Sequence, residues 1–167
     1  MFTGQSRRFR RRASILDRAE LERVVADLIA RRGRLDVLVN NAGMTRPGTL
    51  LTQTDADWNL VLATNLTGPF ICSSIAARQM REAGRGGAIV NIGSISAHGI
   101  RTGPPAYAAA KAGLEGLTRN AAIELGPYGI RVNLIVLGTI STEWLLARKS
   151  AEDLAEIRAS TLTGRIG

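Results

Sequence analysis

A tyrosine and a lysine stand four residues apart in the alanine-rich segment PPAYAAAKAGLEG, residues 104 to 116. Alanine is the strongest helix former, so this segment predicts a helix in which Tyr107 and Lys111 share one face. Ionising a phenol near neutral pH costs about 4 kcal/mol. An ammonium about 5 Å away offsets on the order of 3 kcal/mol of this at an effective dielectric near 20, and the dipole at the helix start also favours the anion. The pair is therefore a candidate acid/base.

Two further polar residues have positions that suit chemistry. Ser94 follows an apolar run, and its hydroxyl could donate a hydrogen bond to a substrate oxygen on which negative charge develops. Ser96 competes for this role, but we prefer Ser94 on position. Asn65 stands inside a predicted helix, where asparagine is unfavourable because its side chain competes for backbone hydrogen bonds. We therefore expect Asn65 to hold a water or a neighbouring carbonyl.

Each of these residues also has an ordinary structural explanation. A Tyr-x-x-x-Lys pair is common and usually means a packed ring beside a solvated amine. Ser94 would then be a loop hydroxyl, Asn65 a buried polar bridge, and the NNAG segment at 40–43 a simple turn. Their joint placement after successive predicted strands favours the catalytic interpretation.

Helix and strand signals alternate from Asp17 onward. The expected helices run from Asp17, as a capping box with Glu20, to Gly33, then from Thr54 to Gly84 and from Pro105 to Gly126, with two weaker helical segments after residue 137. Between them, the runs RLDVLVN, AIVNI and IRVNLIV predict three buried strands. The first helix carries one apolar stripe at helical spacing, made of Leu21, Val24, Val25, Leu28 and Ile29. The buried candidates of the second helix include Trp58, Val61, Leu62 and Phe70.

Strands separated by long helices pair in parallel through right-handed crossovers, so the predicted fold class is α/β, with helices on both faces of the sheet. Residues 17–167 form one domain after a basic tail, 1–16, that we expect to be disordered. Ligands of such sheets bind at the carboxyl ends of the strands. Those ends are predicted at Asn40–Gly43, Gly93–Ser96 and Leu137–Thr142.

The composition excludes several classes of protein. The single cysteine, Cys72, rules out an internal disulfide framework, and without a secretory signal core this favours a reducing, cytoplasmic setting. One histidine and one cysteine argue against a His/Cys metal site. The apolar stretches are short and interrupted, so no membrane span is expected.

The net charge of +8 is concentrated at one end of the chain. The run RRFRRR at 7–12 holds five of the 22 basic residues. A solvated or spurious tail, a nucleic-acid contact and an organelle-targeting segment all remain open as interpretations of this run. No interleaved aromatic platform or nucleic-acid module follows it, so a nucleic-acid partner is not expected.

From about Asp17 to its last residue, the chain resembles the short-chain dehydrogenase/reductase family, in particular the kind that includes bacterial 3-oxoacyl-acyl-carrier-protein reductases. The resemblance rests on DVLVNNAG at 36–43, NLTGPF at 65–70, IVNIGSISA at 89–97, YAAAK at 107–111 and RVN at 131–133. It implies an incomplete Rossmann-type, doubly wound parallel sheet with flanking helices.

The same resemblance implies NAD(P)-dependent hydride transfer between a small-molecule carbonyl and a secondary alcohol. It makes Tyr107 the catalytic acid/base, with Ser94 orienting and polarising the substrate oxygen. Lys111 would favour the phenolate and bind the nicotinamide ribose, while Asn65 supports a water-mediated proton relay. The cofactor, NAD or NADP, is expected to contact Asn40, Asn41, Ala42, Gly43, Tyr107 and Lys111, with Ile140 and Thr142 near its carboxamide.

The chain also departs from the family pattern. The glycine-rich phosphate loop is absent, because TGQSRRFR at 3–10 lacks the later glycines and GRGGAI at 84–89 leads into a strand. We expect about two β–α units to be missing before Asp17 and the family's last strand to be missing after the final TGRIG. Leu137 replaces the proline that usually precedes the glycine at 138.

These departures have two consequences. One edge of the sheet should be exposed, which favours pairing with another chain. The helices starting near Thr54 and Pro105 are present, so a homo-oligomer through them is expected. The alternative to an oxidoreductase is a non-catalytic remnant or association module of the same family.

Overall fold

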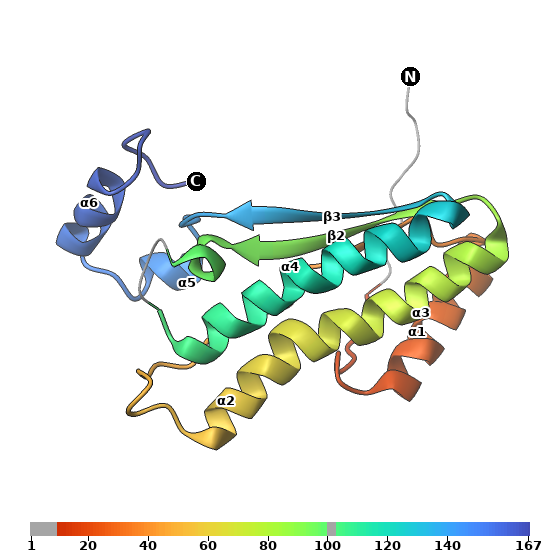
Figure 1. Ribbon diagram of the computed structural model, residues 1–167, viewed down its shortest axis with the longest axis horizontal. Helices are drawn as coiled ribbons and strands as arrows, with labels where there is room; N and C mark the ends of the chain where they lie inside the picture. The colour runs from red at the N-terminus through yellow and green to blue at the C-terminus, as the bar shows by residue number, and fades with distance from the viewer. Residues whose placement is uncertain (1–9, 100–102) are drawn as a thin grey trace.

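The computed structural model describes residues 10–99 and 103–167, which form one sheet with helices packed beneath it (Figure 1). The helices are α1 (Arg18–Arg32), α2 (Asp55–Leu62), α3 (Gly68–Ala83), α4 (Pro105–Leu125), α5 (Glu143–Leu146) and α6 (Ala151–Ala159). The strands are β1 (Val37–Asn40), β2 (Gly87–Ser94) and β3 (Ile130–Leu137). They are parallel in the order β1-β2-β3, with Val37 opposite Ala88 and Gly87 opposite Ile130. The predicted α/β class with a parallel sheet is confirmed.

Helix α1 begins and ends almost where the sequence predicts. The Asp17 carboxylate accepts a hydrogen bond from the Glu20 N–H at 2.9 Å, and Gly33 closes the helix with φ of 78°. The second hydrogen bond of the predicted capping box, in which the Glu20 carboxylate would accept from the Asp17 N–H, is not formed, however. The Glu20 carboxylate accepts from the Ser14 N–H instead, at 3.0 Å.

The predicted helix from Thr54 to Gly84 contains an irregular turn. Thr54 caps α2, and a π-helical turn at Ala63–Thr67 joins α2 to α3 without breaking the helix. Pro69 has no N–H to donate, so it cannot make the regular α-helical bond to the carbonyl of Asn65. We attribute the wider turn to this missing bond, because such turns form where the regular ladder is interrupted.

The core lies between the sheet, α3 and α4. Met80 and Ile89 are fully buried there, packed with Ile130 and small residues of α3. Val61 is fully buried, as predicted. Trp58 and Phe70 are 37% and 49% exposed, so their predicted burial is wrong.

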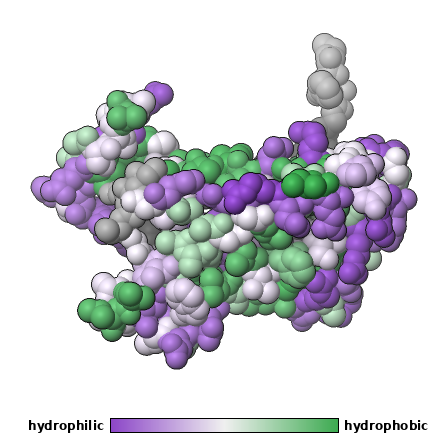
Figure 2. Space-filling model, viewed as in Figure 1, coloured by the Kyte–Doolittle hydropathy of each residue, from purple (hydrophilic) through white to green (hydrophobic). Residues whose placement is uncertain are grey.

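Apolar surface is also displayed on the loop before α2. Leu50 and Leu51 are both largely exposed there, and this loop forms the green tip at the lower left of Figure 2.

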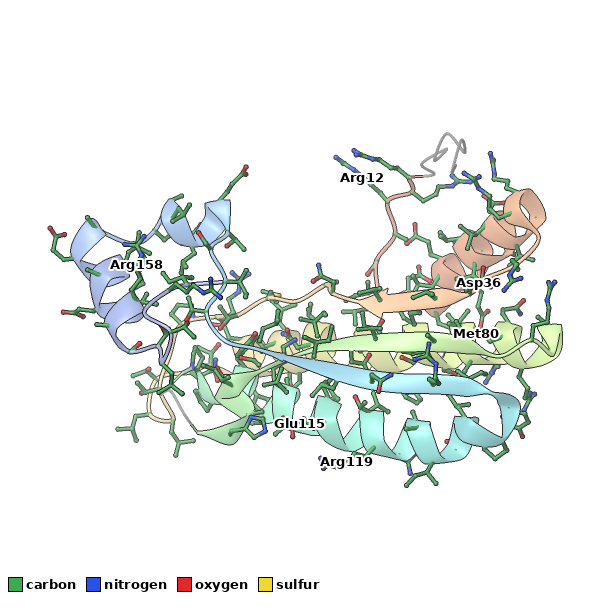
Figure 3. All side chains as sticks on the ribbon, turned by 90° about the horizontal axis from the view of Figure 1, so that it is seen from above. Arg12, Asp36, Met80, Glu115, Arg119 and Arg158 are labelled. Atoms are coloured by element: carbon green, nitrogen blue, oxygen red, sulfur yellow. The ribbon has the colours of Figure 1, made fainter. Side chains whose placement is uncertain are left out.

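One face of the sheet carries no long helix. Helices α1, α3 and α4 lie on the same side of the strands, and only α5 and α6 lie toward the other side, at one end (Figures 1 and 3). Val37 and Val39 are each 54% exposed. The prediction of a buried strand is therefore wrong for this face of β1. The predicted exposed edge is present, because β1 has only β2 beside it among the described residues.

Among the described residues, one helical stretch, Asp55–Ala83, is long and apolar enough to cross a membrane by length and composition. This differs from the expectation that no such stretch exists. The stretch packs against the sheet and α4 and buries Ile71, Ile75 and Met80. Core helices of globular domains meet the same two criteria, so the observation is weak evidence for a span.

The basic tail is described from Arg10 onward. Arg11 pairs with Asp27 at 2.6 Å, and this hydrogen bond holds the pKa of the Asp27 carboxyl below its usual value. Ile15 packs so closely on Gly68 that a Cβ there would lie 2.7 Å from the Ile15 Cδ1. The rest of the arginine run, residues 7–9, and the TGQSRRF stretch at 3–9 lie outside the described residues.

Candidate active site

The three strands end at one edge of the sheet, with Asn40, Ser94 and Leu137 as their last residues. The segments that follow them are those that the sequence identified as the ligand-binding edge. This agreement follows from the parallel pairing, because all carboxyl ends of a parallel sheet lie on the same side.

A chain of buried polar side chains braces this edge. The Asn40 amide donates to the Ser73 hydroxyl at 2.9 Å and to the Asn91 side-chain oxygen at 2.8 Å. The Asn91 amide in turn donates to the Thr118 hydroxyl at 2.9 Å. These bonds join β1 to α3, β2 and α4. Sequence reasoning missed Ser73, Asn91 and Thr118, although an asparagine inside the apolar run AIVNI was a usable signal.

Asn65 fastens the turn after β1 to the long helix. Its side chain is completely buried, and its amide donates to the Met44 carbonyl at 2.7 Å and to the Val61 carbonyl at 2.9 Å. Its side-chain oxygen accepts from the Met44 N–H at 3.3 Å. Asn65 thus holds neighbouring carbonyls, one of the two duties that its unfavourable helical position suggested.

Gly43 is the point where this turn meets α4. A Cβ at Gly43 would lie 2.8 Å from the Asn65 side-chain oxygen and 3.8 Å from the Lys111 Nζ. Three of the predicted site residues, which are far apart in the sequence, therefore converge here. No other residue type fits without moving Asn65.

Lys111 is enclosed beside Tyr107. Its side chain is 5% exposed, and its ammonium donates to the Ile92 carbonyl at 2.7 Å and lies 5.6 Å from the centre of the Tyr107 ring. Desolvation by burial lowers the pKa of this ammonium. A lysine has three N–H donors. Among the described residues, the Lys111 ammonium has one hydrogen-bond acceptor, the Ile92 carbonyl. Two donors therefore remain for a ligand.

Helix α4 begins with Pro105 in its first turn, as the sequence predicts. The Ala106 N–H donates to the Gln53 side-chain oxygen at 2.9 Å, so the start of α4 is tied to the residues before α2. This contact fixes the first turn, which carries Tyr107.

Ser94 and Ser96 stand together at the end of β2. The Ser94 hydroxyl accepts from the Ser96 N–H and donates to the Ser96 hydroxyl, both at 3.2 Å. Ser94 is buried at the strand end and Ser96 is half-buried. Both line a cavity of about 540 Å³ between the ends of β2 and β3 and helices α5 and α6. Tyr107 and Lys111 do not line this cavity, but Lys111 bonds the same strand at Ile92, two residues before Ser94.

The loop after β3 is held by its own contacts. Thr142 caps α5, accepting from the Leu145 N–H at 3.2 Å, and Ile140 is 39% exposed. Gly167 closes on this loop through backbone bonds with Thr139 and Ser141. The cofactor contacts predicted for Ile140 and Thr142 stay predictions.

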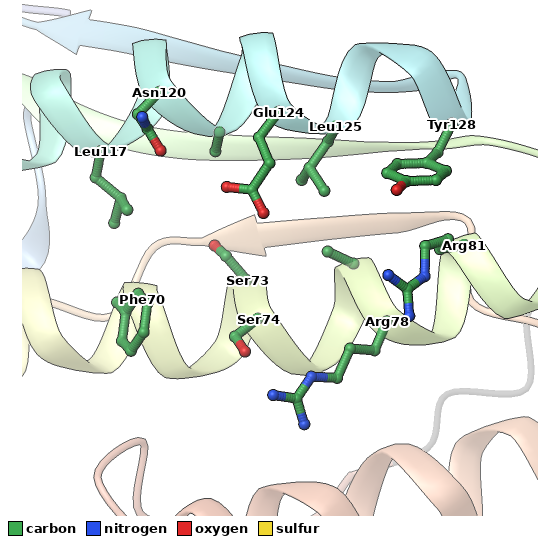
Figure 4. Close-up of a pocket in the computed structure, with 12 residues that line it drawn as sticks. Phe70, Ser73, Ser74, Arg78, Arg81, Leu117, Asn120, Glu124, Leu125 and Tyr128 are labelled. Carbon is green, nitrogen blue, oxygen red and sulfur yellow. The ribbon is translucent and has the colours of Figure 1, made fainter.

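A second hollow, of about 510 Å³, lies between α3 and α4 (Figure 4). Phe70, Leu117 and Tyr128 line it with charged residues, and the Arg81 guanidinium lies 5.6 Å from the centre of the Tyr128 ring. It is distinct from the strand-end cavity, because the two share no lining residue.

A parallel sheet with polar side chains gathered at its carboxyl edge defines a Rossmann-type α/β domain. The sequence model of a family described as enoyl-(acyl carrier protein) reductase matches residues 4–167. The chain is 42% identical over 149 residues to the short-chain reductase protein NovJ of Streptomyces niveus, covering 86% of this chain and 56% of NovJ. It is 38% identical over 154 residues to the 3-oxoacyl-[acyl-carrier-protein] reductase FabG of Salmonella typhimurium, covering 92% and 62%.

A solved structure described as a short-chain dehydrogenase/reductase from Burkholderia xenovorans superimposes with a TM-score of 0.85 at 36% identity, covering 93% of this chain and 60% of that one. The chain belongs to the short-chain dehydrogenase/reductase family of oxidoreductases. It spans 56 to 62% of the length of these relatives.

Proposed function

We propose that this chain carries the catalytic residues of an NAD(P)-dependent oxidoreductase that interconverts a small-molecule carbonyl and a secondary alcohol. The observation that carries the proposal is the convergence of Gly43, Asn65 and Lys111 at the carboxyl edge of the sheet. A packed helix with no function would not need to enclose an ammonium there, because burying a charge is costly unless it is used or paired.

Each side chain has a separate duty in this proposal. The Tyr107 hydroxyl gives a proton to the substrate oxygen in reduction and takes it back in oxidation. The Ser94 hydroxyl donates a hydrogen bond to the same oxygen, on which charge develops. The Lys111 ammonium stabilises the phenolate electrostatically. Asn65 holds the turn at Met44 and supports a proton relay through water from Lys111.

The residues around Gly43 fit the nicotinamide and ribose end of a dinucleotide. The absent Cβ lets the Gly43 backbone lie against Asn65 and Lys111, Asn41 and Ala42 are exposed, and two Lys111 N–H donors are available for ribose hydroxyls. Asn40 braces this turn from within, and Ile140 and Thr142 would flank the carboxamide. When bound, NAD or NADP supplies the hydride chemistry. The residues described here do not distinguish the two cofactors.

Substitution of the two tyrosines tests this proposal, because the chain has only two. With NADPH and ethyl acetoacetate, Tyr107→Phe should lower kcat/KM by about 100-fold or more, the usual contribution of a general acid. Its NADPH affinity, measured by fluorescence titration, should stay within about twofold of the unmodified chain's. Tyr128→Phe is the matched control and should change neither value. Equal activity of Tyr107→Phe and the unmodified chain would refute the assignment.

The second candidate function is a non-catalytic association module. The half-exposed Phe70 in the hollow between α3 and α4 favours it. Failure of the chain to bind NADPH or NADH, together with a defined oligomer in solution, would select this function over the oxidoreductase.

Homo-oligomer formation through α3 and α4 is compatible with both candidates. Phe70→Arg places a charge in this surface and should reduce the oligomer mass in sedimentation velocity. Leu51→Arg, on the exposed loop before α2, is the matched control. If both variants keep the oligomer of the unmodified chain, the α3–α4 surface is not the interface.

We also propose a cytoplasmic location, because the single cysteine is free. Cys72 is partly buried, and desolvation raises the pKa of its thiol, which lowers its reactivity. Cell fractionation tests this proposal, and recovery of the chain in a secreted fraction would contradict it.

A further inference from the structure

The cavity at the ends of β2 and β3, which Ser94 lines, is also lined by polar residues of helix α6. Asp153, Glu156 and Ile157 of helix α6 and its C-cap residue Ser160 line it, and their spacing of three and four residues places them on one helix face. Three of these four side chains are polar. Ser94, the last residue of β2, and Ser96 line the same cavity.

Most of the charge around the cavity is already paired. The Lys149 ammonium lies 3.6 Å from the Asp153 carboxylate, which also accepts from the Ser150 N–H at 3.2 Å as part of the capping box of α6. Glu156 differs, because its carboxylate has no hydrogen bond or ion pair in the part of the chain that the structure describes. Glu156 therefore leaves one uncompensated negative charge on the cavity wall.

An ionised carboxylate accepts hydrogen bonds and cannot donate them. A ligand in this cavity gains by bringing a donor to Glu156 and loses by bringing a second anion. An alkyl chain laid against Glu156 and the Lys149–Asp153 pair would remove their water without replacing its hydrogen bonds. Ile95, Leu145 and Ile157 supply the aliphatic part of the lining.

We propose that the substrate of this site is a small carbonyl compound carrying a hydrogen-bond donor, an ammonium or a hydroxyl, which Glu156 recognises while Ser94 holds the carbonyl oxygen. This inference rests on the proposed oxidoreductase function. It excludes anionic ketones as the preferred substrates.

A charge series on one carbon skeleton tests the inference. 4-Aminobutan-2-one, 4-hydroxybutan-2-one and acetoacetate are methyl ketones that differ at one end as ammonium, hydroxyl and carboxylate. We expect kcat/KM with NADPH to fall in that order, by about threefold to tenfold from first to last, because Glu156 is exposed and its field is screened. Glu156→Gln should bring the three values within about twofold of one another.

Glu152→Gln is the matched control, because Glu152 lies in the first turn of the same helix but does not line the cavity. It removes the same charge from α6 and should leave the order unchanged. If Glu152→Gln levels the series as well as Glu156→Gln does, the preference comes from the general field of the chain and the inference is overturned.

Ligand-observed NMR separates this inference from the proposed function. Saturation transfer from the protein to each of the three ketones reports binding without turnover. The inference requires the amino or hydroxy ketone to bind more tightly than acetoacetate, and Glu156→Gln to remove the difference. Turnover that is fastest with acetoacetate would overturn the inference and leave the oxidoreductase standing. Selective binding without turnover of any ketone would overturn the oxidoreductase and leave Glu156 as the determinant of a ligand preference only. Equal binding of all three would overturn the inference.

Discussion

Replacing Gly43 with alanine tests whether the turn after β1 is as tightly enclosed as the structure shows. The new Cβ would lie 2.8 Å from the Asn65 side-chain oxygen, whereas ordinary contacts begin near 3.4 Å, so one of the two must move by about 0.6 Å. Asn65 cannot move freely, because its amide bonds both the Val61 and Met44 carbonyls. Losing one such buried bond costs about 1 to 3 kcal/mol.

A smaller effect opposes this loss. Alanine restricts the unfolded chain more than glycine does, which stabilises the folded state by about 0.4 to 1 kcal/mol where the backbone conformation allows alanine. Gly43 is not among the glycines with positive φ, so it gains this benefit. We therefore expect Gly43→Ala to destabilise the chain by about 1 to 2 kcal/mol. This corresponds to a fall in Tm of about 2 to 8 °C for a domain of this size.

Urea unfolding followed by circular dichroism measures this change, and Gly116→Ala on α4 is the control. A Cβ at Gly116 meets nothing within 4 Å, so alanine should stabilise that helix position by about 0.5 to 1 kcal/mol. In an Asn65→Ala background, Gly43→Ala should lose its penalty. A penalty of equal size with and without the Asn65 side chain would refute the proposed contact.

Three further changes have expected outcomes. Thr118→Val removes the acceptor of the buried Asn91 amide and should destabilise the chain by about 1 to 3 kcal/mol in urea unfolding; no change would show that Asn91 finds another acceptor. Burial lowers the pKa of the Lys111 ammonium from its usual 10.5, so the unfolded chain binds more protons than the folded one as the pH rises toward 10.5. Stability should therefore gain a rising contribution over that alkaline range, and Lys111→Met should remove it; identical pH profiles would contradict the burial effect. Gly33→Ala places a side chain at φ of 78° and should lower the Tm of unfolding by a few degrees, about 1 kcal/mol; an unchanged Tm would mean that the helix end relaxes.

Local signals predicted most of the elements correctly. The cap at Asp17, the glycines after α1 and α3, and Pro105 in the first turn of α4 mark helix ends through backbone chemistry that does not depend on tertiary packing. The π turn at Ala63–Thr67 could not be predicted from periodicity, because it results from the combination of a missing Pro69 donor and a buried Asn65.

Burial was predicted less well than secondary structure. Periodicity shows that a helix has an apolar face but not what covers that face, so Trp58 and Phe70 were assigned to a core from which both are partly exposed. The predicted burial of Val37 and Val39 was wrong for a related reason. A run of β-branched residues predicts a strand covered on both sides, whereas the described helices beside β1 lie on one side only.

The candidate site was predictable in its members but not in its connections. Parallel pairing places the strand ends together, so Gly43 and Ser94 were expected at one edge. The sequence gives no sign that a Gly43 Cβ would collide with Asn65, or that Lys111 bonds the Ile92 carbonyl. Such contacts depend on tertiary packing between segments that are far apart in the sequence, and periodicity does not encode it.

The two sides of the site follow strands that differ in how well their backbone amides are protected from solvent. Strand β2 pairs on both edges and is covered on one face by α3 and α4, whereas β1 pairs on one edge and exposes one face. Amide hydrogen exchange should therefore be slowest around Ile89 and faster at Val39 and the turn that ends at Gly43. Ser94 and the Lys111 acceptor belong to the slow unit, while the turn proposed to receive the dinucleotide belongs to the fast one. The proton-handling groups could then stay assembled while the cofactor side opens and closes.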